Sequence, residues 1–399
     1  MPVLNTNTSK LPSPDADSQA HSERVRDHII DVIDGAGGSI GFAEFMHHAL
    51  YAKGLGYYHA GATKFGEAGD FVTAPEISTL FGKVLANQAA IVLGQIRNFE
   101  NRAVLEIGAG SGVLAVDMLQ RLESLGLLPS RYYILEVSPD LQERQRIAIE
   151  TALPDYVDNV VWLSDLPESF TGVIVANEVL DALPVERFVK RNGQVFQLAV
   201  TIADGEFTWA ELPAPDVLAA AVQSIETDLN LELPDGYQSE VSLGVYEWLG
   251  NLAGCMEQGF VFLFDYGVSQ RDYYAADRYG GWLRCHFRHH VHNDPLVLPG
   301  IQDLTAWVNF SQVANAAYDG GLKIEGFVTQ AQFLLLGGIA QELQDIASLP
   351  TEAQIKLSQQ AKLLMMPGEM GENFKCLGLS KGKIKVPDLF SDADRSHTL

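Results

Sequence analysis

The sequence predicts an α/β fold with a doubly wound, Rossmann-like sheet, and the order of its apolar segments is the main reason. Between residues 103 and 176, short apolar runs rich in β-branched and aromatic residues alternate with helix-length segments. Strands that are buried on both faces and separated by helices form parallel sheets with right-handed crossovers. A glycine-rich turn at residues 108–112 also joins the first run to a helix, which is typical of this fold. The predicted strands are 103–107, 132–137, 160–163 and 173–176, with helices at 112–125 and 140–152.

The region before this alternation is predicted to be helical. Apolar residues recur at helical spacing over 24–33, and a second helix is expected over 41–52. Pro75 at a helix start indicates a third helix from 76 to about 98. A glycine-rich loop is expected between the second and third of these helices.

The pattern changes after residue 184. Asn192-Gly193 and Asp204-Gly205 are typical of two-residue hairpin turns, so residues 185–212 are predicted to form an antiparallel meander. A mostly helical stretch is expected to follow, as far as residue 256.

The last part of the chain returns to the earlier alternation. Strands are expected at 259–264 and 324–328, and helices over 330–365. Residues 270–302 show no regular period and are rich in arginine, histidine and aromatic residues. They are predicted to be an irregular insertion.

The composition limits the classes of partner. The formal charge is −24, from 27 Lys and Arg against 51 Asp and Glu, so the protein's field would repel a phosphate backbone. We therefore expect no nucleic-acid partner. A basic protein substrate would suit this charge, although acidic composition also serves solubility alone.

The cysteines and the apolar runs bear on the expected compartment. Cys255, Cys285 and Cys376 form no C-x-x-C pair, which favours a reducing compartment without structural zinc. No apolar run approaches the roughly 20 residues of a membrane span. Residues 1–21 have neither a secretion-signal core nor the character of a transit peptide, so a cytoplasmic protein is expected.

The turn after the first predicted strand indicates the cofactor. Gly108, Gly110 and Gly112 form a Gly-x-Gly-x-Gly turn, which lets the backbone approach a ligand at the start of a helix. Val113 stands where a dinucleotide fingerprint needs its third glycine. Glu106 beside the turn would repel a pyrophosphate but suits the cationic amino-acid end of S-adenosylmethionine. The spacing therefore favours S-adenosylmethionine.

Two further carboxylates follow the next predicted strands. Glu136 lies where a carboxylate can accept both ribose hydroxyls, and Asp165 lies where the adenine amino group is expected. A helix cap explains Asp165 equally well. Glu136 also leaves a nicotinamide oxidoreductase as a weak alternative, against the glycine spacing.

The fourth predicted strand leads into the candidate catalytic residues, Asn177, Glu178 and Asp181. In open α/β sheets, ligands bind beyond the carboxyl ends of the strands, so these side chains are expected beside the methyl group. Asn177 is expected to contact the cofactor as well. Paired carboxylates could hold a guanidinium, localise its charge and take its proton. The plainer interpretation is that Asn177 caps the next turn and Asp181 is solvated.

Several short motifs follow one another along the chain: Gly56-Tyr57-Tyr58, GDFVTAPEI at 69–77, EIGAGSG at 106–112, Asn177-Glu178, DALP at 181–184, DYG at 265–267 and PGEMGE at 367–372. Together they resemble the MidA family of S-adenosylmethionine-dependent methyltransferases. The mitochondrial members of that family are arginine methyltransferases that assist assembly of respiratory complex I. The resemblance covers nearly all of the chain from about residue 22.

The resemblance implies a lid over the cofactor, formed by an N-terminal loop that contains Gly69, Asp70, Phe71 and Thr73. It also shows a departure from the family. Members usually carry Thr-Ala-His-Val-Asp where this chain has Trp307 and Asn309, so a histidine and a carboxylate are lost. This departure makes a second hypothesis reasonable, namely an assembly chaperone that binds the cofactor but has little catalytic activity.

The expected organisation has five segments: a disordered tail (1–22), N-terminal helices with the cofactor lid loop (23–100), a cofactor-binding core (101–184), a meander with a helical insertion (185–258), and the rest of the core (259–399) with a substrate-facing insertion at 270–302. The inserted α+β region is expected to bind the substrate protein. A homodimer is a further expectation.

A cluster in the 270–302 insertion could suggest a metal site. Cys285, His286, His289, His290 and His292 lie close together in the sequence. Their spacing matches no ligand motif, and methyl transfer needs no metal. We therefore expect no metal and interpret the cluster as part of a protein-binding loop.

Overall fold

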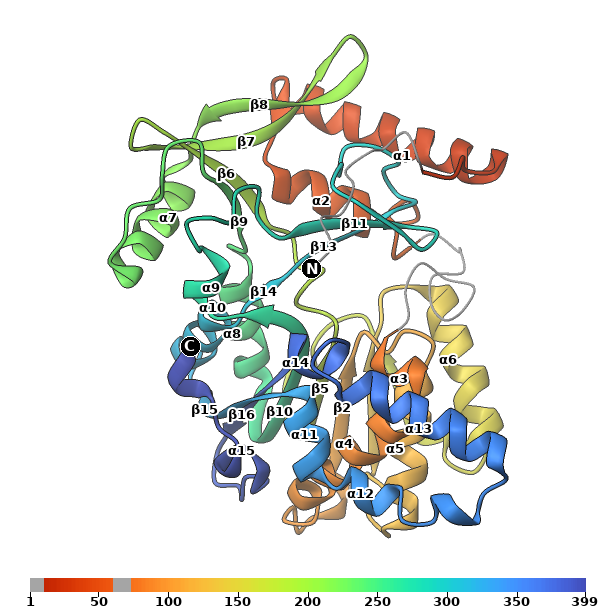
Figure 1. Ribbon diagram of the computed structural model, residues 1–399. Coiled ribbons are helices and arrows are strands. Elements are labelled where there is room, and N and C mark those ends of the chain that lie inside the picture. Colours follow the sequence, from red (N-terminus) through yellow and green to blue (C-terminus); the bar gives the residue numbers. More distant parts are fainter. Residues whose placement is uncertain (1–10, 60–72) are drawn as a thin grey trace. The chain divides into compact units, whose positions relative to one another are not determined.

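The computed structural model describes residues 11–59 and 73–399 (Figure 1). The chain forms two compact units. The meander unit consists of Met1–Phe71, Asp181–Val245 and Ser269–Asn309, and the sheet unit consists of Val72–Leu180, Tyr246–Val268 and Phe310–Leu399. The boundary after the predicted core therefore falls at residue 181 instead of 185. The predicted helices at 24–33 and 41–52 belong to the meander unit, whereas the third predicted helix belongs to the sheet unit.

The sheet unit contains the predicted doubly wound sheet. Its strands lie in the order β15-β16-β10-β5-β2-β3-β4. The five strands from β10 to β4 are parallel, whereas β16 and β15 are antiparallel to their neighbours. The bounds are β2 Ala103–Ile107, β3 Arg131–Leu135, β4 Val160–Leu163, β5 Phe170–Asn177, β10 Met256–Val268, β15 Lys323–Thr329 and β16 Phe374–Lys381. The fold class predicted from the sequence is confirmed.

Buried apolar side chains form the core between the sheet and its helices. Every residue of β2 is buried, and alternate residues of β10, Phe260, Phe262 and Phe264, pack into one large apolar cluster. Helices that contribute to this cluster include α4, α5 and α11. The helices of the sheet unit have the bounds α3 Ala74–Ile77, α4 Thr79–Leu93, α5 Val113–Ser124, α6 Pro139–Ala152, α10 Phe310–Asp319, α11 Gln330–Gly337, α12 Ile339–Glu342, α13 Thr351–Met365, α14 Met370–Asn373 and α15 Leu389–Asp392. Helix α8 (Val245–Cys255) begins at the boundary residue.

Two glycines allow the central strands to approach one another. Gly172 in β5 and Gly259 in β10 both have a φ of +148°. A side chain at Gly172 would overlap the backbone of Ala103, and one at Gly259 would overlap that of Gly172. Only glycine fits at these positions.

The helix predicted from residue 76 to about 98 is interrupted. Ser78 has an extended backbone, with φ −160° and ψ 141°, and ends α3. Its side chain then accepts a hydrogen bond from the Leu80 N–H and caps α4. Serine is a common N-cap residue, so Ser78 in the sequence was an indication that a second helix begins here.

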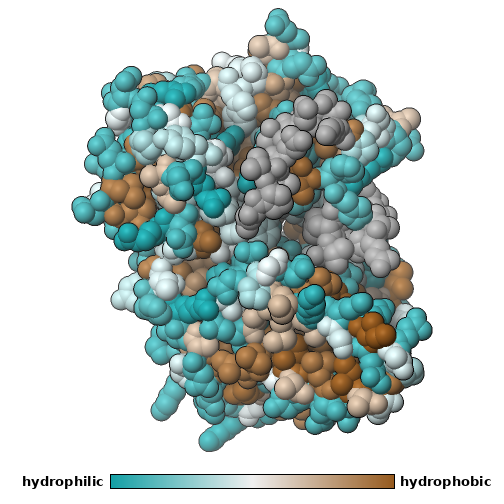
Figure 2. Space-filling model, viewed as in Figure 1, coloured by the Kyte–Doolittle hydropathy of each residue, from teal (hydrophilic) through white to brown (hydrophobic). Residues whose placement is uncertain are grey.

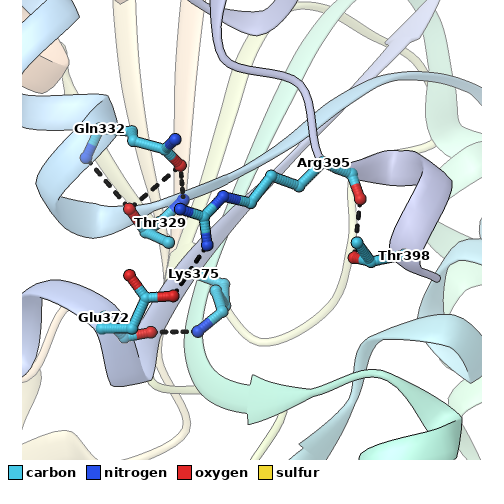
Figure 3. Close-up of polar contacts among 6 residues, drawn as sticks. All are labelled: Thr329, Gln332, Glu372, Lys375, Arg395 and Thr398. Atoms are coloured by element: carbon cyan, nitrogen blue, oxygen red, sulfur yellow. Dashed lines mark hydrogen bonds and ion pairs between the residues drawn. The ribbon is translucent and has the colours of Figure 1, made fainter. Parts of the chain in front are cut away.

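The C-terminal segment is tied to the motif at 367–372 (Figure 3). Arg395 Nη1 lies 2.8 Å from Glu372 Oε1, and Lys375 donates to the Glu372 carbonyl. A side chain at Gly371 would overlap the backbone of Met365. These contacts give the motif a structural role.

The start of α11 is also visible in Figure 3, where Thr329 and Gln332 form a capping box.

The meander unit combines helices with an antiparallel sheet. The strands lie in the order β1-β7-β6-β9, and β8 pairs with β7. The predicted turns are confirmed: Asn192, Gly193, Asp204 and Gly205 all have positive φ, as the hairpin turn requires. The bounds are α1 Ala16–Gly35, β1 Ser39–Ile40, α2 Phe42–Tyr51, β6 Glu186–Arg191, β7 Gln194–Ala203, β8 Glu206–Pro213, α7 Asp216–Leu229 and β9 Gln238–Val241.

Two expectations for this unit need correction. Helix α1 begins at Ala16 because Asp15 caps it, so residues 16–22 are helical and not part of a tail. The insertion at 270–302 is not irregular, because it contains α9 and two strands of the sheet β12-β11-β13. Alternate residues of β11 are buried, a period of two that the many polar residues obscured. The bounds are α9 Gln270–Tyr273, β11 Leu283–Phe287, β12 His290–His292, β13 Asp303–Ala306 and β14 Val308–Asn309.

Candidate functional site

The glycine turn lies at the carboxyl end of β2, between β3 and β5. This is where the order of the strands reverses, the position at which doubly wound sheets bind ligands. Gly108, Gly110 and Gly112 have φ values of 69°, 54° and 86°. A side chain at Gly112 would come within 3.0 Å of the Gln145 Cα. These conformations favour glycine at all three positions. Gly112 is the N-cap residue of α5, whose first backbone N–H groups have no partner within the helix.

Glu106 lies beneath this turn and is almost completely buried. The Tyr132 hydroxyl donates a hydrogen bond of 2.6 Å to its carboxylate. The pKa of Glu106 is raised to about 7, mainly by burial; the hydrogen bond from Tyr132 lowers it and the nearby charge of Glu136 raises it. The Glu106 side chain thus links the end of β2 to Tyr132 of β3 within the core. Its contact with the cationic end of the cofactor stays a prediction.

Glu136 is connected to the glycine turn through a residue that the sequence did not reveal. Its Oε1 accepts the Ser138 N–H at 2.9 Å, and its Oε2 accepts from Gln145 Nε2 at 3.1 Å. The same Gln145 nitrogen donates to the Gly110 carbonyl at 2.9 Å. Gln145 is completely buried in α6. The sequence did contain an indication of this role, because Gln145 is the polar residue in the buried series Leu141, Gln145 and Ile149 of α6.

A second unpredicted contact holds the other side of the turn. The Ser111 hydroxyl donates to the Glu76 carboxylate, which reaches the turn from α3. Thr73, predicted as part of the lid, is half-buried and precedes α3 as its N-cap residue. Gly69, Asp70 and Phe71, the other predicted lid residues, lie outside the described residues.

Asp165 follows β4 and is exposed. Its carboxylate accepts a hydrogen bond of 2.9 Å from Ser164. No helix begins among the described residues between β4 and β5, so the helix-cap interpretation of Asp165 is wrong, and an adenine contact for Asp165 stays a prediction.

Asn177 and Glu178 lie at the carboxyl end of β5, the neighbour of β2. Glu178 has a φ of 54°, unusual for a residue with a side chain. Its N–H donates to the Phe264 carbonyl at 2.9 Å, and Asn177 Nδ2 donates to its carboxylate at 3.3 Å. Among the described residues, the buried Oδ1 of Asn177 has no hydrogen-bond partner. A ligand with N–H or O–H groups would satisfy it.

Asp181 is the first residue of the meander unit, whereas Glu178 belongs to the sheet unit. The side chain of Asp181 is buried, and the backbone carbonyl of Asp181 accepts a hydrogen bond of 2.9 Å from the Ala306 N–H. Burial contradicts the plainer interpretation of Asp181 as a solvated residue. The pairing of its carboxylate with Glu178 stays a prediction.

These residues suit S-adenosylmethionine. The turn at 108–112 has glycine at three left-handed positions and precedes a helix, and Gln145 bonds Glu136 to it. Within residues 11–59 and 73–399, the Oδ1 of Asn177 has no hydrogen-bond partner. Residues 84–328 match the family model described as "Putative S-adenosyl-L-methionine-dependent methyltransferase". The chain belongs to this family. The resemblance to the MidA family is thereby confirmed, and the nicotinamide alternative is set aside.

A solved structure of a similar protein contains the demethylated form of the cofactor. The methyltransferase is 38% identical to a Burkholderia thailandensis protein whose crystal structure contains S-adenosyl-homocysteine. The match covers 98% of this chain and 100% of that one, with a TM-score of 0.90. S-adenosylmethionine is therefore the cofactor of this methyltransferase.

Curated relatives carry a more specific name. The chain is 28% identical to the protein arginine methyltransferase NDUFAF7 homolog, mitochondrial, of Drosophila melanogaster, over 92% of this chain and 88% of the relative. It is 30% identical to the protein arginine methyltransferase NDUFAF7, mitochondrial, of Mus musculus, over 86% and 81%. The similarity extends over both units.

Neither a metal site nor a membrane span is found in the parts of the methyltransferase that the structure describes. Across residues 11–59 and 73–399, no group of three or more His, Cys, Asp and Glu side chains could hold a metal ion. Burial lowers the pKa of His286 to about 4 and raises that of Cys285. No described helix is long and apolar enough to cross a bilayer.

The residues that depart from the family pattern are built into the meander unit. Trp307 stacks on Trp282 with ring centroids 4.3 Å apart. Asn309 is buried, and its Nδ2 donates to Gln270 Oε1 at 3.4 Å. Both side chains therefore make contacts within the meander unit.

Proposed function

We propose that the methyltransferase transfers the methyl group of S-adenosylmethionine to an arginine side chain of a protein substrate, and that this modification aids assembly of a respiratory complex. The best single support is the left-handed backbone conformation of Glu178. Glu178 follows β5, and β5 pairs with β2, the strand that leads into the glycine turn. A carboxylate held in an unfavourable backbone conformation at a ligand-binding edge is typical of a functional residue. The names of the relatives from Drosophila and mouse favour the same acceptor.

The chemistry explains why carboxylates are needed. The cofactor supplies an electrophilic methyl group when bound. An arginine side chain keeps its proton and its delocalised charge at neutral pH, so its nitrogen is a poor nucleophile. In this proposal, Glu178 and Asp181 hold the guanidinium bidentately, localise its charge and take the proton that leaves. Asn177 orients the Glu178 carboxylate through its side-chain amide.

Labelled S-adenosylmethionine tests this function directly. The purified protein is incubated with labelled cofactor and a protein extract of its own organism, and the modified peptides are identified. Methylarginine in one or a few peptides, lost with Glu178→Gln, is the expected result. Label on another residue type, or equal labelling by the variant, would contradict the proposal.

A second candidate function is an assembly chaperone that binds the cofactor without much catalysis. The observation in its favour is the packed state of Trp307 and Asn309, where the family usually has a histidine and a carboxylate. Glu178→Gln separates the two functions. Normal maturation of the client complex in cells that contain only this variant, with methylation abolished, would favour the chaperone.

The remaining expectations concern partners and location. A basic protein substrate, a cytoplasmic location and a homodimer stay proposals. Figure 2 shows apolar side chains gathered over the region of α11 to α13, which would suit a dimer interface. The exposed large apolar residues of α11, of α13 and of the residue after α13 are Leu335, Leu336, Ile355, Leu363 and Met366. Light scattering that reports a monomer at micromolar concentration would exclude the homodimer.

A further inference from the structure

A buried carboxylate lies beside the turn that contains Glu178. Asp265 follows Phe264 in β10, and Phe264 is the last residue of that strand that pairs with β5. The Asp265 side chain has no exposed surface. Its Oδ2 accepts the Leu180 N–H at 3.0 Å, and its Oδ1 accepts the Tyr266 N–H at 2.9 Å. The chemistry proposed above uses neither oxygen.

These contacts anchor the chain on both sides of the turn. The Glu178 N–H donates to the Phe264 carbonyl, and two residues later the Leu180 N–H donates to Asp265. Adjacent residues of β10 therefore hold both ends of one short segment. The segment needs such support, since a left-handed conformation is sterically unfavourable for a residue with a side chain. Such a conformation persists only where the surroundings determine it.

We propose that Asp265 is a positioning residue for methyl transfer, which fixes the backbone at Glu178 and thereby the direction of the Glu178 carboxylate. The inference rests on the proposed function, because Asp265 acts only through Glu178. It also explains why a carboxylate is present. Both oxygens of Asp265 accept from backbone N–H donors, whereas a side-chain amide could accept at only one of these positions.

The chemistry of the two contacts makes Asp265→Asn the informative substitution. The variant has nearly the same shape, but its NH₂ group must face either Leu180 or Tyr266, where it meets another donor. The turn then loses an anchor while the glycine turn on β2 stays intact. We expect the rate of methyl incorporation at saturating cofactor to fall about tenfold or more, with the KM for S-adenosylmethionine within about twofold.

A double-mutant cycle separates positioning from general stability. Methyl incorporation into the protein extract is measured for Asp265→Asn, Glu178→Gln and the pair. Residues that act as a unit give strongly non-additive effects, so Asp265→Asn is expected to change the residual rate of Glu178→Gln less than about twofold. Val261→Ala, in the buried first part of β10, is the matched control for lost stability. It is expected to lower Tm without a comparable loss of rate.

The outcomes decide the inference in either direction. The inference would be overturned if the rate losses of Asp265→Asn and Glu178→Gln multiplied in the double variant. It would also be overturned if Val261→Ala and Asp265→Asn had the same Tm and lost the same fraction of the methylation rate. If Glu178→Gln retains the full rate, the catalytic proposal fails instead. A crystal structure of Asp265→Asn then judges the inference alone: a negative φ or disorder at Glu178 supports it, and an unchanged turn overturns it.

Discussion

Two turns at the carboxyl ends of neighbouring strands both contain left-handed backbone, but different features make that conformation possible. The turn after β2 adopts positive φ at Gly108, Gly110 and Gly112, where glycine removes the steric cost. The turn after β5 adopts positive φ at Glu178, and contacts with β10 hold it there. The first turn is predicted to bring its backbone close to the cofactor, whereas the second turn keeps a carboxylate side chain. The comparison indicates that glycine suffices where only the backbone is used, whereas strain is retained where a carboxylate is needed.

The largest expected effect comes from making the second turn like the first. Glu178→Gly relieves the left-handed strain, so the free energy of unfolding should stay the same or rise by about 0.5–1 kcal/mol. The rate of methylation should nevertheless fall about a thousandfold, because the carboxylate is lost. Thermal unfolding and methyl incorporation measure the two effects. Asn192→Gly, at a hairpin position of similar φ, is the control and should leave the rate unchanged.

The converse change places a side chain in the first turn. Gly112→Val adds left-handed strain and pushes against Gln145, so the affinity for S-adenosylmethionine should fall about a hundredfold or more. Calorimetric titration measures this affinity. Gly126→Ala shares the positive φ but meets no atom within 4 Å, so it should lose some stability and keep its affinity. Equal affinity losses in both variants would show that strain alone, and not the site, is responsible.

A smaller effect concerns the buried carboxyl group beneath the first turn. The folded-state pKa of Glu106 is about 7, above its ordinary value of 4.5, so the folded protein binds the proton more tightly than the unfolded chain. Glu106 should therefore lower the free energy of unfolding by on the order of 1–3 kcal/mol as the pH rises from about 4.5 to about 7. Glu106→Gln should remove this slope in denaturant titrations across that range.

Tyr132→Phe refines the same experiment. Because the tyrosine hydroxyl stabilises the ionised carboxylate, its removal should raise the pKa of Glu106 and extend the loss of stability to higher pH. A slope that is the same in the wild type and in both variants would contradict the assignment to Glu106.

The smallest effect tests the link between the first turn and the predicted ribose carboxylate. Gln145→Leu removes the hydrogen bonds to Gly110 and Glu136 while keeping the apolar volume, so the cofactor's affinity should fall about threefold to tenfold. Thr151→Ala, farther along the same helix, should leave the affinity unchanged. Titration calorimetry compares the two, and an unaffected affinity in Gln145→Leu would remove that residue from the site.

The sequence was informative where local pattern determines structure. The parallel strands, the two hairpin turns and the glycine turn were all predicted, since each depends on residues close together in the chain. Gln145, Glu76 and the role of Asp265 were missed because their partners lie far away in the sequence, as Leu180 does from Asp265. The strands within 270–302 were missed because histidine and arginine occupy alternate positions between buried residues.

In the proposed site, the glycine turn holds S-adenosylmethionine and Glu178 faces the methyl group to be transferred. A crystal structure of this protein with S-adenosyl-homocysteine tests it most directly. We expect the ligand against residues 108–112, with its ribose hydroxyls on Glu136 and its sulfur toward the Glu178 carboxylate. A ligand bound elsewhere, or a Glu178 side chain directed away from the sulfur, would contradict it.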